Sequence, residues 1–339
     1  MSPVLKNGAF TPNNEMTDAI RAEGLVKQFK GKRALDGVDL RARTGAVLGV
    51  LGPNGSGKTT TVRILATLLR PDGGHAEVGG FDVARQPHEV RRLIGLTGQY
   101  AAVDADLTGT QNLVLIARLL GFDRAGARAR SAELMERFEL SDAAGRPAKT
   151  YSGGMRRRLD LAASLVGRPS LLYLDEPTTG LDPHSRNGLW DVVRGLVDDG
   201  VTVLLTTQYL EEADQLADDL MVLDHGRVIS EGTPEELKSR AGNQVLEVRT
   251  VETGQLSLAT GIIEAVTSTP VTSDGLLASV PVTDSAVLPE VVRRLDEQGV
   301  AVAELSLRKP SLDEVFLALT GHAAEEEAPR GAVDEGTRA

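Results

Sequence analysis

The nine residues from Gly52 to Thr60 (GPNGSGKTT) constrain the fold more than any other stretch of the chain. They match the pattern G-x-x-x-x-G-K-[S/T], in which backbone N–H groups of a glycine-rich turn surround phosphate oxygens. The apolar run 46–51 predicts a buried parallel strand before the motif, and apolar residues at helical spacing in 60–69 predict a helix after it. This order predicts an α/β fold that binds a nucleotide. The residues expected to contact the nucleotide here are Gly52, Pro53, Asn54, Gly55, Ser56, Gly57, Lys58, Thr59 and Thr60.

Two side chains of the motif have a specific chemical role. The Lys58 ammonium is expected to reach the β- and γ-phosphates, and the Thr59 hydroxyl is expected to bind Mg²⁺. The alternative is a glycine-rich turn that contains a lysine by chance. Average residue usage predicts such a chance match in a chain of this length on the order of 1 time in 100. Because a strand and a helix also flank the motif, nucleotide binding is the better explanation.

A second apolar strand, 171–174, ends in the adjacent carboxylates Asp175 and Glu176. Acidic side chains at the carboxyl end of a parallel strand beside such a loop are placed to meet Mg²⁺ and the attacking water. Asp175 is therefore a candidate magnesium ligand, and Glu176 is a candidate general base. A third buried strand, 201–207, delivers Gln208 at its end.

Two other features of the sequence suggest further contacts with a ligand or a partner. Phe29, at the end of a predicted strand, is either a core residue or a ring that stacks on adenine. The stretch Ser152-Gly153-Gly154 opens a predicted helix that runs to residue 166. Ser152 is suited to cap this helix, and the two glycines permit the backbone of another molecule to approach closely.

Composition excludes several classes of function. A net charge of −11 and an aromatic content of 3% argue against nucleic acid as a partner. Without cysteine, the chain has no disulfide framework and no thiolate metal site. No run reaches the roughly 18 apolar residues that cross a bilayer, and the first residues do not resemble a secretory signal. Work at a membrane would therefore require a partner that spans it.

The composition and the predicted secondary structure change several times along the 339 residues of the chain, a length that allows about two domains. A block rich in Leu, Ala and Arg interrupts an alternating α/β pattern. A later region of mixed strands and helices contains no group of residues typical of a catalytic site. The predicted segments are a disordered arm (1–17), an α/β nucleotide-binding domain (18–242) with a helical subdomain (about 108–165), a small α+β accessory or dimerisation domain (243–320) and a disordered acidic tail (321–339).

Taken together and in order, these motifs resemble those of the ATP-binding subunits of ABC transporters, over roughly residues 18–242. The matching stretches are Walker A (52–59), the Q-loop glutamine Gln99, the signature YSGGM (151–155), Walker B (171–175) with Glu176, and the D-loop residue Asp182. Three further stretches are similar to the daunorubicin-resistance type of drug-export ATPase and extend the resemblance to about residue 320. They are IGLTGQ (94–99), TTQYLEEAD (206–214) and PSLDEVF (310–316).

The resemblance implies a P-loop ATPase that powers the export of a drug, antibiotic or lipid-like compound through a separate permease. Such a subunit is peripheral to the membrane, on its cytoplasmic face. Two copies are implied to pair head to tail, so that Ser152, Gly153 and Gly154 of one copy complete the ATP site of the other. Asp182 is also implied to be a nucleotide-binding residue. The implied catalytic residues are Lys58, Gln99, Glu176 and Gln208, and the implied magnesium ligands are Thr59, Gln99 and Asp175. The Q-loop and the helical insert (108–145) are where contact with the permease is expected.

Two departures from the family pattern concern the signature and the switch position. The signature begins with Tyr151 and ends with Met155 in place of Leu and Gln, and Gln208 stands where most members carry a histidine. A glutamine amide can donate a hydrogen bond to a γ-phosphate oxygen but cannot take up a proton, so we expect hydrolysis to continue. The alternative functions are a dimeric interaction module switched by ATP and a soluble ABC protein without a transport role.

Overall fold

The computed structural model describes residues 18–98, 103–240, 244–282 and 286–320. The predicted arm 1–17, the predicted tail 321–339 and Gln99 lie outside the described residues. Three sheets organise the described chain, in the strand orders β10-β9-β3-β8-β7-β6, β2-β1-β4-β5 and β12-β13-β11-β14.

The six-stranded sheet is the centre of the larger domain. All of its pairings are parallel except that between β9 and β10. The carboxyl ends of β3, β7 and β8 therefore lie at one edge, which brings the glycine-rich turn, Asp175 and Gln208 together. The strands are β3 (Val47–Leu51), β6 (Ile94–Thr97), β7 (Leu171–Asp175), β8 (Thr202–Thr207), β9 (Asp219–Asp224) and β10 (Arg227–Gly232).

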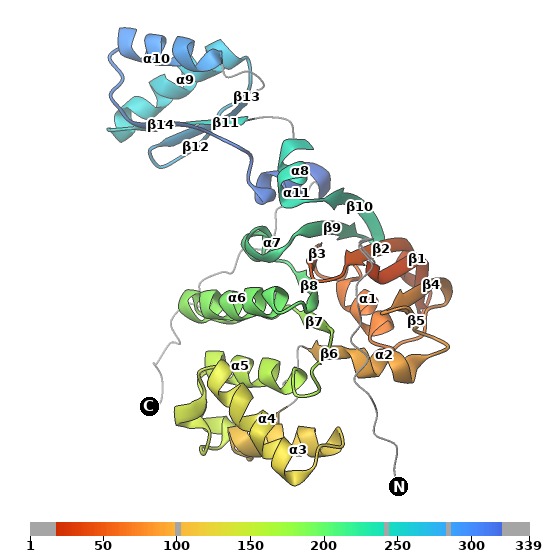
Figure 1. Ribbon diagram of the computed structural model, residues 1–339. Helices are drawn as coiled ribbons and strands as arrows, with labels where there is room; N and C mark the ends of the chain where they lie inside the picture. Colours follow the sequence, from red (N-terminus) through yellow and green to blue (C-terminus); the bar gives the residue numbers. More distant parts are fainter. Residues whose placement is uncertain (1–17, 99–102, 241–243, 283–285, 321–339) are drawn as a thin grey trace, which may run out of the picture.

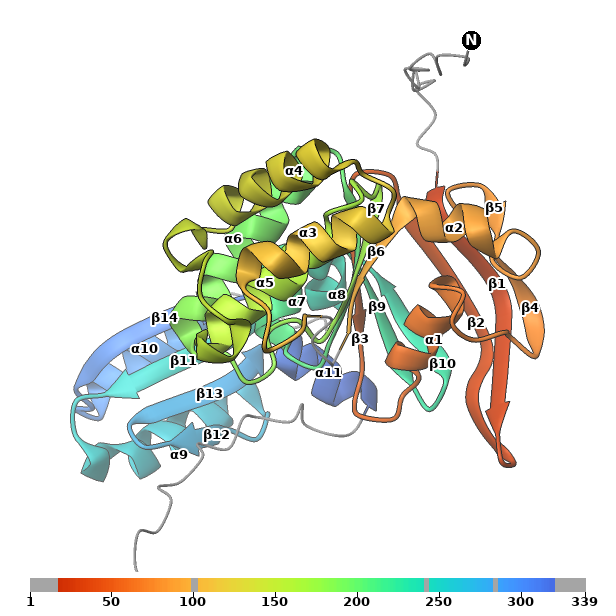
Figure 2. The ribbon, with the colours of Figure 1, turned by 90° about the horizontal axis from the view of Figure 1, so that it is seen from below.

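Both faces of this sheet are covered, as its continuous apolar strands require. Along β7, Leu172 and Leu174 join one core cluster, whereas Leu171 and Tyr173 join another. Figure 2 shows the helices α3, α4 and α5 on one side of the sheet and the antiparallel strands β1, β2 and β4 on the other. The antiparallel sheet contains β1 (Asp18–Phe29), β2 (Lys32–Arg43), β4 (Gly73–Val78) and β5 (Phe81–Asp82), and lies beside α1 (Lys58–Leu65) and α2 (Pro87–Leu93).

The helix after the glycine-rich turn is shorter than its apolar pattern predicts. The pattern continues to Leu69, but α1 ends at Leu65. The backbone at Thr67 is left-handed, with φ of 61°, which stops an α-helix. Leu68 is consequently exposed, while Leu65 is fully buried.

The helical subdomain consists of helices that begin at polar caps. Thr108 forms a capping box with Gln111, and the side chains of Asp123, Ser152 and Asp182 each accept a hydrogen bond from the first turn of the helix that follows. The capping role predicted for Ser152 is confirmed. The helices on this side are α3 (Gly109–Leu119), α4 (Arg124–Arg137), α5 (Gly153–Ser164) and α6 (Pro183–Asp198), with 3₁₀ turns at Ser141–Ala143 and Ala148–Thr150.

A small sheet near the C-terminus has its own apolar core. Its four antiparallel strands pack against α9 and α10, with Leu246, Ile263 and Leu295 among the buried residues. Figure 1 shows this sheet standing apart from the larger domain, with α8 and α11 between them. The elements are β11 (Gln244–Thr250), a 3₁₀ turn (Thr253–Gln255), α9 (Leu256–Thr267), β12 (Thr272–Asp274), β13 (Leu277–Val282), α10 (Val287–Glu297) and β14 (Val302–Arg308).

The last helix, α11 (Leu312–Thr320), packs on the larger domain and not in the core of the small sheet. Leu312, Val315 and Phe316 form one apolar face, which shares a cluster with Leu210 and Leu237. These two partners belong to α7 (Leu210–Leu216) and α8 (Pro234–Arg240). The segment predicted as one unit (243–320) thus contains two parts that belong to separate cores.

Polar contacts fix the start of α11. A capping box is present, because the Ser311 N–H donates to Glu314 Oε2 at 2.7 Å and the Glu314 N–H donates to Ser311 Oγ at 3.2 Å. The Arg308 guanidinium at the end of β14 also binds both Glu314 and Glu247. The small sheet and α11 are therefore joined by an ion-pair network as well as by the chain.

Removing the buried ring of Phe316 is expected to loosen α11 from the larger domain. Truncating a buried Phe to Ala costs about 3–5 kcal/mol, and Phe316 is buried against α7 and α8. Limited proteolysis of Phe316→Ala should therefore release the C-terminal segment faster than it does in the unmodified protein. The neighbouring exposed residue provides the control, since Leu317→Ala should leave the cleavage rate unchanged. Equal cleavage of the two variants would contradict this packing.

Candidate nucleotide site

The glycine-rich turn links β3 to α1 in a backbone shape that other residues would not tolerate. Gly57 precedes the first residue of α1 with φ of 119°. A Cβ at this position would lie 2.8 Å from the Ala34 carbonyl oxygen and 2.7 Å from Leu35 Cδ2. The glycine therefore lets β2 approach the turn, and the N–H groups at the start of the helix that follows favour an anion.

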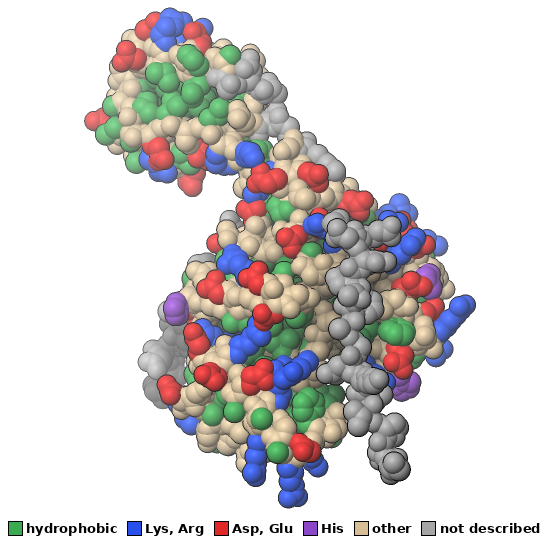
Figure 3. Space-filling view, viewed as in Figure 1, with side chains coloured by type: hydrophobic (Ala, Val, Ile, Leu, Met, Phe, Trp, Pro, Cys, Tyr) green, Lys and Arg blue, Asp and Glu red, His purple; other side chains and the backbone are tan. Residues whose placement is uncertain are grey.

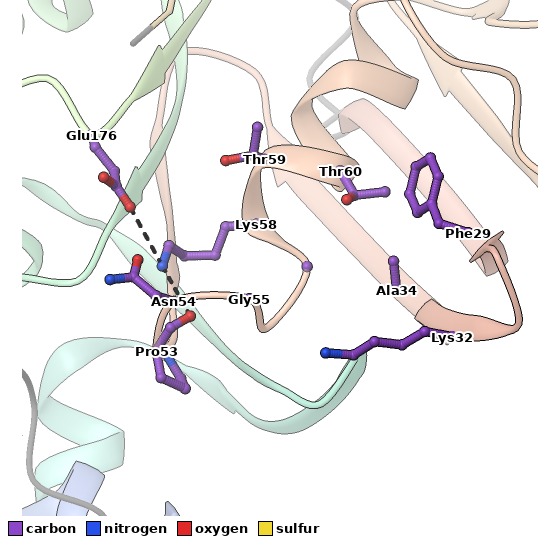
Figure 4. Close-up of a pocket in the computed structure, with 11 residues that line it drawn as sticks. Phe29, Lys32, Ala34, Pro53, Asn54, Gly55, Lys58, Thr59, Thr60 and Glu176 are labelled. Atoms are coloured by element: carbon purple, nitrogen blue, oxygen red, sulfur yellow. Dashed lines mark hydrogen bonds and ion pairs between the residues drawn. The ribbon is translucent and has the colours of Figure 1, made fainter.

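Lys58 lies at the base of this turn and is 4% exposed. Its Nζ donates to the Gly52 carbonyl at 2.6 Å and to the Pro53 carbonyl at 3.3 Å, and it is 3.6 Å from Glu176 Oε1 (Figure 4). The turn thus holds a buried ammonium beside a carboxylate. Such a charge attracts phosphate strongly because little water screens it.

A cavity of about 370 Å³ lies in front of the turn. This volume is in the range of sites that hold small ligands. In Figure 4, Phe29 and Lys32 lie at one end of the cavity, and Lys58 and Glu176 lie at the other. The lining residues are Phe29, Lys32, Ala34, Pro53, Asn54, Gly55, Gly57, Lys58, Thr59, Thr60 and Glu176.

Phe29 is not a core residue. The residue is 46% exposed and lines the cavity, with Lys27 Nζ 5.7 Å from the ring centroid. The core-residue interpretation of Phe29 is therefore wrong, and the aromatic ring is available at the end of the cavity remote from Lys58.

Asp175, the last residue of β7, forms an oxygen-rich cluster with two hydroxyl groups. Its Oδ1 accepts hydrogen bonds from Thr206 Oγ1 at 2.5 Å and from Thr59 Oγ1 at 3.3 Å. Carboxylate and hydroxyl oxygens are ligands that Mg²⁺ accepts, and they fit this ion. Within the described ranges, no group of three or more His, Cys, Asp and Glu side chains could hold a metal alone. A cation here would therefore need phosphate and water oxygens as well.

Glu176 follows Asp175 in an uncommon backbone conformation. Its φ of 51° places it in the left-handed region, which is disfavoured for residues other than glycine. The Glu176 N–H donates to the Thr206 carbonyl at 3.0 Å, and the Glu176 carbonyl accepts from Arg157 Nη2 at 3.0 Å. Local strain of this kind persists where neighbouring groups hold it, as happens at many functional positions.

The residue after β8, Gln208, reaches the same sheet edge. Its Oε1 atom is buried and has no hydrogen-bond partner among the residues that the structure describes. Nearby, the carboxyl group of Glu212 is fully buried and accepts a hydrogen bond from Trp190 Nε1. Burial raises the pKa of Glu212 above its usual range.

Ser152, Gly153 and Gly154 lie away from this cavity. None of the three lines it. Gly153 instead borders a second hollow of about 480 Å³, together with Glu176 and the 179–181 loop. Asp182, just beyond that loop, caps α6, and its hydrogen bonds with Ser185 lower the pKa of the Asp182 carboxyl group. One chain therefore brings the glycine-rich turn and the carboxylates together at one cavity, whereas its serine–glycine turn borders the second hollow.

Sequence reasoning omitted three residues at the site. Lys32 and Ala34 line the cavity because the chain after Phe29 turns back as strand β2, which runs beside the glycine-rich turn. Thr206 binds Asp175 because β7 and β8 are neighbours in the sheet. The position of Lys32 just after the two-residue turn that follows Phe29 was a usable signal, whereas nothing in the sequence pairs Thr206 with Asp175.

Comparison with known proteins identifies the family. The sequence model described as ABC transporter matches residues 35–179, and the one described as the C-terminal domain of DrrA1-3-like ATP-binding proteins matches residues 232–320. The chain is 54% identical to the daunorubicin/doxorubicin resistance ATP-binding protein DrrA of Streptomyces peucetius, over 95% of this chain and 98% of that protein. The chain belongs to the ABC transporter ATP-binding proteins.

Two other relatives agree with this assignment. The doxorubicin resistance ATP-binding protein DrrA of Mycobacterium tuberculosis is 48% identical over 91% of this chain and 95% of its own length. The solved ADP conformation of an ATP-binding cassette of an ABC transporter is 26% identical, with a TM-score of 0.59 over 65% of this chain and 92% of that chain. The predictions of an ABC ATPase fold and of a C-terminal domain are confirmed.

Membership of this family also defines the reaction and the kind of assembly in which such subunits work. The chain is an ATPase that binds nucleotide and serves ATP-driven export. ATP-binding subunits of this family work as dimers with membrane permease partners. In the part of the chain that the structure describes, no helix is both long and apolar enough to cross a bilayer.

Proposed function

We propose that two copies of this chain power the export of an anthracycline-like drug or a related antibiotic through a separate permease. The copies are bound peripherally to the permease at the cytoplasmic face of the membrane. One observation carries this proposal: similarity to a daunorubicin/doxorubicin resistance protein extends over 95% of the chain. It includes the C-terminal region, which matches the DrrA-type domain over residues 232–320.

In this proposal the cavity holds ATP with its triphosphate at the glycine-rich turn. Lys58 and the N–H groups of 52–60 bind the phosphates, and Phe29 stacks on adenine at the other end. Thr59 and Asp175, with Gln99 from the Q-loop, would hold Mg²⁺, which neutralises phosphate charge when it is bound. The hydroxyl and carboxylate oxygens around Asp175 Oδ1 support this assignment.

Glu176 is proposed as the general base that takes a proton from the attacking water. Its carboxylate borders both the cavity and the second hollow, so it faces the region where a terminal phosphate would lie. Gln208, at the adjacent strand end, is proposed to donate a hydrogen bond from its amide to a γ-phosphate oxygen. Because the amide stays neutral, the proton from water goes to Glu176 and not to Gln208.

Two copies are proposed to share each nucleotide. Ser152, Gly153 and Gly154 are exposed or partly exposed at the N-terminus of α5, where backbone N–H groups favour an anion. They do not line the cavity of their own chain, which supports a role at the cavity of a partner copy. The D-loop residue Asp182 is proposed to contact the nucleotide.

The permease is proposed to contact the Q-loop and the helical insert (108–145). Leu115, Leu119 and Leu120 on α3 and at its end are exposed large apolar residues. Figure 3 shows basic and apolar side chains at the end of the molecule that holds α3 and α4. Such a mixed surface suits a helical segment of a membrane protein. The small C-terminal domain is proposed to hold the two copies together or to brace them against the permease.

An export assay tests the proposed function. Cells that express the chain with its permease should accumulate less daunorubicin than cells in which the chain carries Glu176→Gln. Equal accumulation, with ATP hydrolysis intact in the purified complex, would contradict drug export. ATP binding without hydrolysis, even with the permease present, would instead favour the interaction-module alternative.

Phe29→Ala is expected to weaken ATP binding without removing the reaction chemistry. Stacking of an aromatic ring on a base contributes about 1–3 kcal/mol, which corresponds to a Kd raised roughly 5- to 100-fold. Titration of the purified protein with a fluorescent ATP analogue measures the change. Phe29→Trp keeps the stacking surface and should bind almost normally. If Phe29→Ala bound ATP as tightly as the unmodified protein, the stacking role would be wrong.

A further inference from the structure

Arg157 lies within α5 but donates hydrogen bonds to two other segments. Its side chain is 17% exposed. Its Nε donates to the Pro177 carbonyl at 2.6 Å, Nη2 to the Glu176 carbonyl at 3.0 Å and Nη1 to the Gly98 carbonyl at 3.1 Å. One guanidinium thus joins the turn after β7 to the residue that precedes Gln99.

The shape of the Arg157 side chain and the groups around it suit a rigid link between these segments. Guanidinium presents several N–H donors in one plane, whereas a lysine ammonium is a compact charge on a flexible stem. Asp160 Oδ2 lies 3.6 Å from Nη1 and balances the buried charge. Without the guanidinium, three carbonyl oxygens in a partly buried region would lose a donor, which is unfavourable.

The contact with Glu176 completes the support of a strained peptide. The Glu176 N–H is held by the Thr206 carbonyl of β8, and the Glu176 carbonyl is held by Arg157. Neighbouring elements therefore hold both the N–H group and the carbonyl group of a residue whose backbone is in the left-handed region. Since χ angles start from the backbone, fixing the backbone also fixes where the carboxylate can reach.

We infer that Arg157 is a positioning residue that holds the Glu176 turn in the geometry required for ATP hydrolysis. It also connects this turn with the helix that begins at Ser152 and with the segment that leads into Gln99. The inference rests on the proposed function, in which Glu176 is the general base and Ser152 meets the nucleotide of a partner copy. In that arrangement, Arg157 links the carboxylate of one ATP site to the helix that contacts the other.

The substitution Arg157→Met tests this role, because it keeps the length of the stem and removes every donor. Misplacing a catalytic group by about 1 Å can cost roughly 10²-fold in rate, so we expect kcat for ATP to fall by about that factor. The KM for ATP and the Kd of an ATP analogue should change less than about threefold, since Arg157 does not line the ATP cavity. Arg157→Lys should recover part of the lost kcat.

Two controls separate positioning from general stability. Arg194 on α6 is half-exposed and also donates to a backbone carbonyl, that of Gln215. Arg194→Met should therefore leave kcat unchanged. Melting temperatures of all variants, with Arg157→Lys as the milder change, show whether each protein is folded. Loss of ATP binding together with kcat would indicate a merely structural role and overturn the inference.

Glu176→Gln is measured in the same series, because it separates an error in the proposed role of Glu176 from an error in the proposed role of Arg157. If Glu176→Gln still hydrolyses ATP, the proposed function of Glu176 is wrong. If Glu176→Gln is inactive while folded Arg157→Met and Arg157→Lys both turn over ATP at the normal rate, only the role of Arg157 is overturned. An inactive Glu176→Gln beside slow, ATP-binding Arg157 variants is the result that we expect.

Discussion

Glu176→Gln is expected to bind ATP normally and to hydrolyse it about 10²- to 10⁴-fold more slowly, the usual contribution of a general base. The amide has nearly the same shape as the carboxylate but cannot accept the proton from water. The backbone of residue 176 is held by Thr206 and Arg157 and not by its own side chain, so the substitution should leave the fold intact. Release of phosphate by the purified protein with Mg-ATP gives the rate.

A second carboxylate provides the matched control for this variant. Glu304 on β14 is exposed and lies in the small C-terminal sheet. Glu304→Gln makes the same chemical change outside the cavity and should hydrolyse ATP at the normal rate. If Glu176→Gln turned over ATP as fast as Glu304→Gln, the base would have to be another group.

Lys58→Ala is expected to reduce ATP binding itself. Hydrogen bonds that involve a charged group contribute about 1.5–3 kcal/mol, so losing this contact should raise the Kd for ATP roughly 10- to 100-fold. Because Lys58 is 4% exposed and its Nζ is held by the Gly52 carbonyl, its ammonium has a fixed position in the cavity. Isothermal titration with Mg-ATP measures the change directly.

Lys32 lines the same cavity and tests whether position or charge matters. It is exposed and lies at the end near Phe29. A charge there is screened by water, so Lys32→Ala should change the Kd for ATP by less than about threefold. Equal losses in the two variants would mean that the cavity attracts ATP only through its overall positive charge.

Much of the site could be predicted from sequence because its parts lie at the ends of strands. The apolar runs before Gly52, Asp175 and Gln208 indicate buried parallel strands, and parallel strands bring their carboxyl ends to one edge. The helix caps at Ser152 and Ser311 could also be predicted, since capping depends on residues only three positions apart. These features are determined locally.

The features that could not be predicted depend on contacts between distant segments. Arg157 looks like an ordinary exposed helix residue in the run Arg156-Arg157-Arg158, and only the tertiary structure brings it to the carbonyls of Gly98 and Pro177. The helix at 312–320 follows the small domain in sequence but packs on α7 and α8, because its apolar face matches theirs. Helix α9 is not evident from the sequence either, since Thr260 and Gly261 interrupt its apolar residues.

Disulfide trapping tests the shared ATP site most directly, because the chain contains no cysteine of its own. One tagged copy carries Asn54→Cys in the glycine-rich turn, a differently tagged copy carries Ser152→Cys, and both carry Glu176→Gln to retain ATP. A head-to-tail pair predicts a cross-link between the two tagged copies that forms with Mg-ATP and is absent without nucleotide. Failure of the two copies to cross-link, although both bind ATP, would contradict the account.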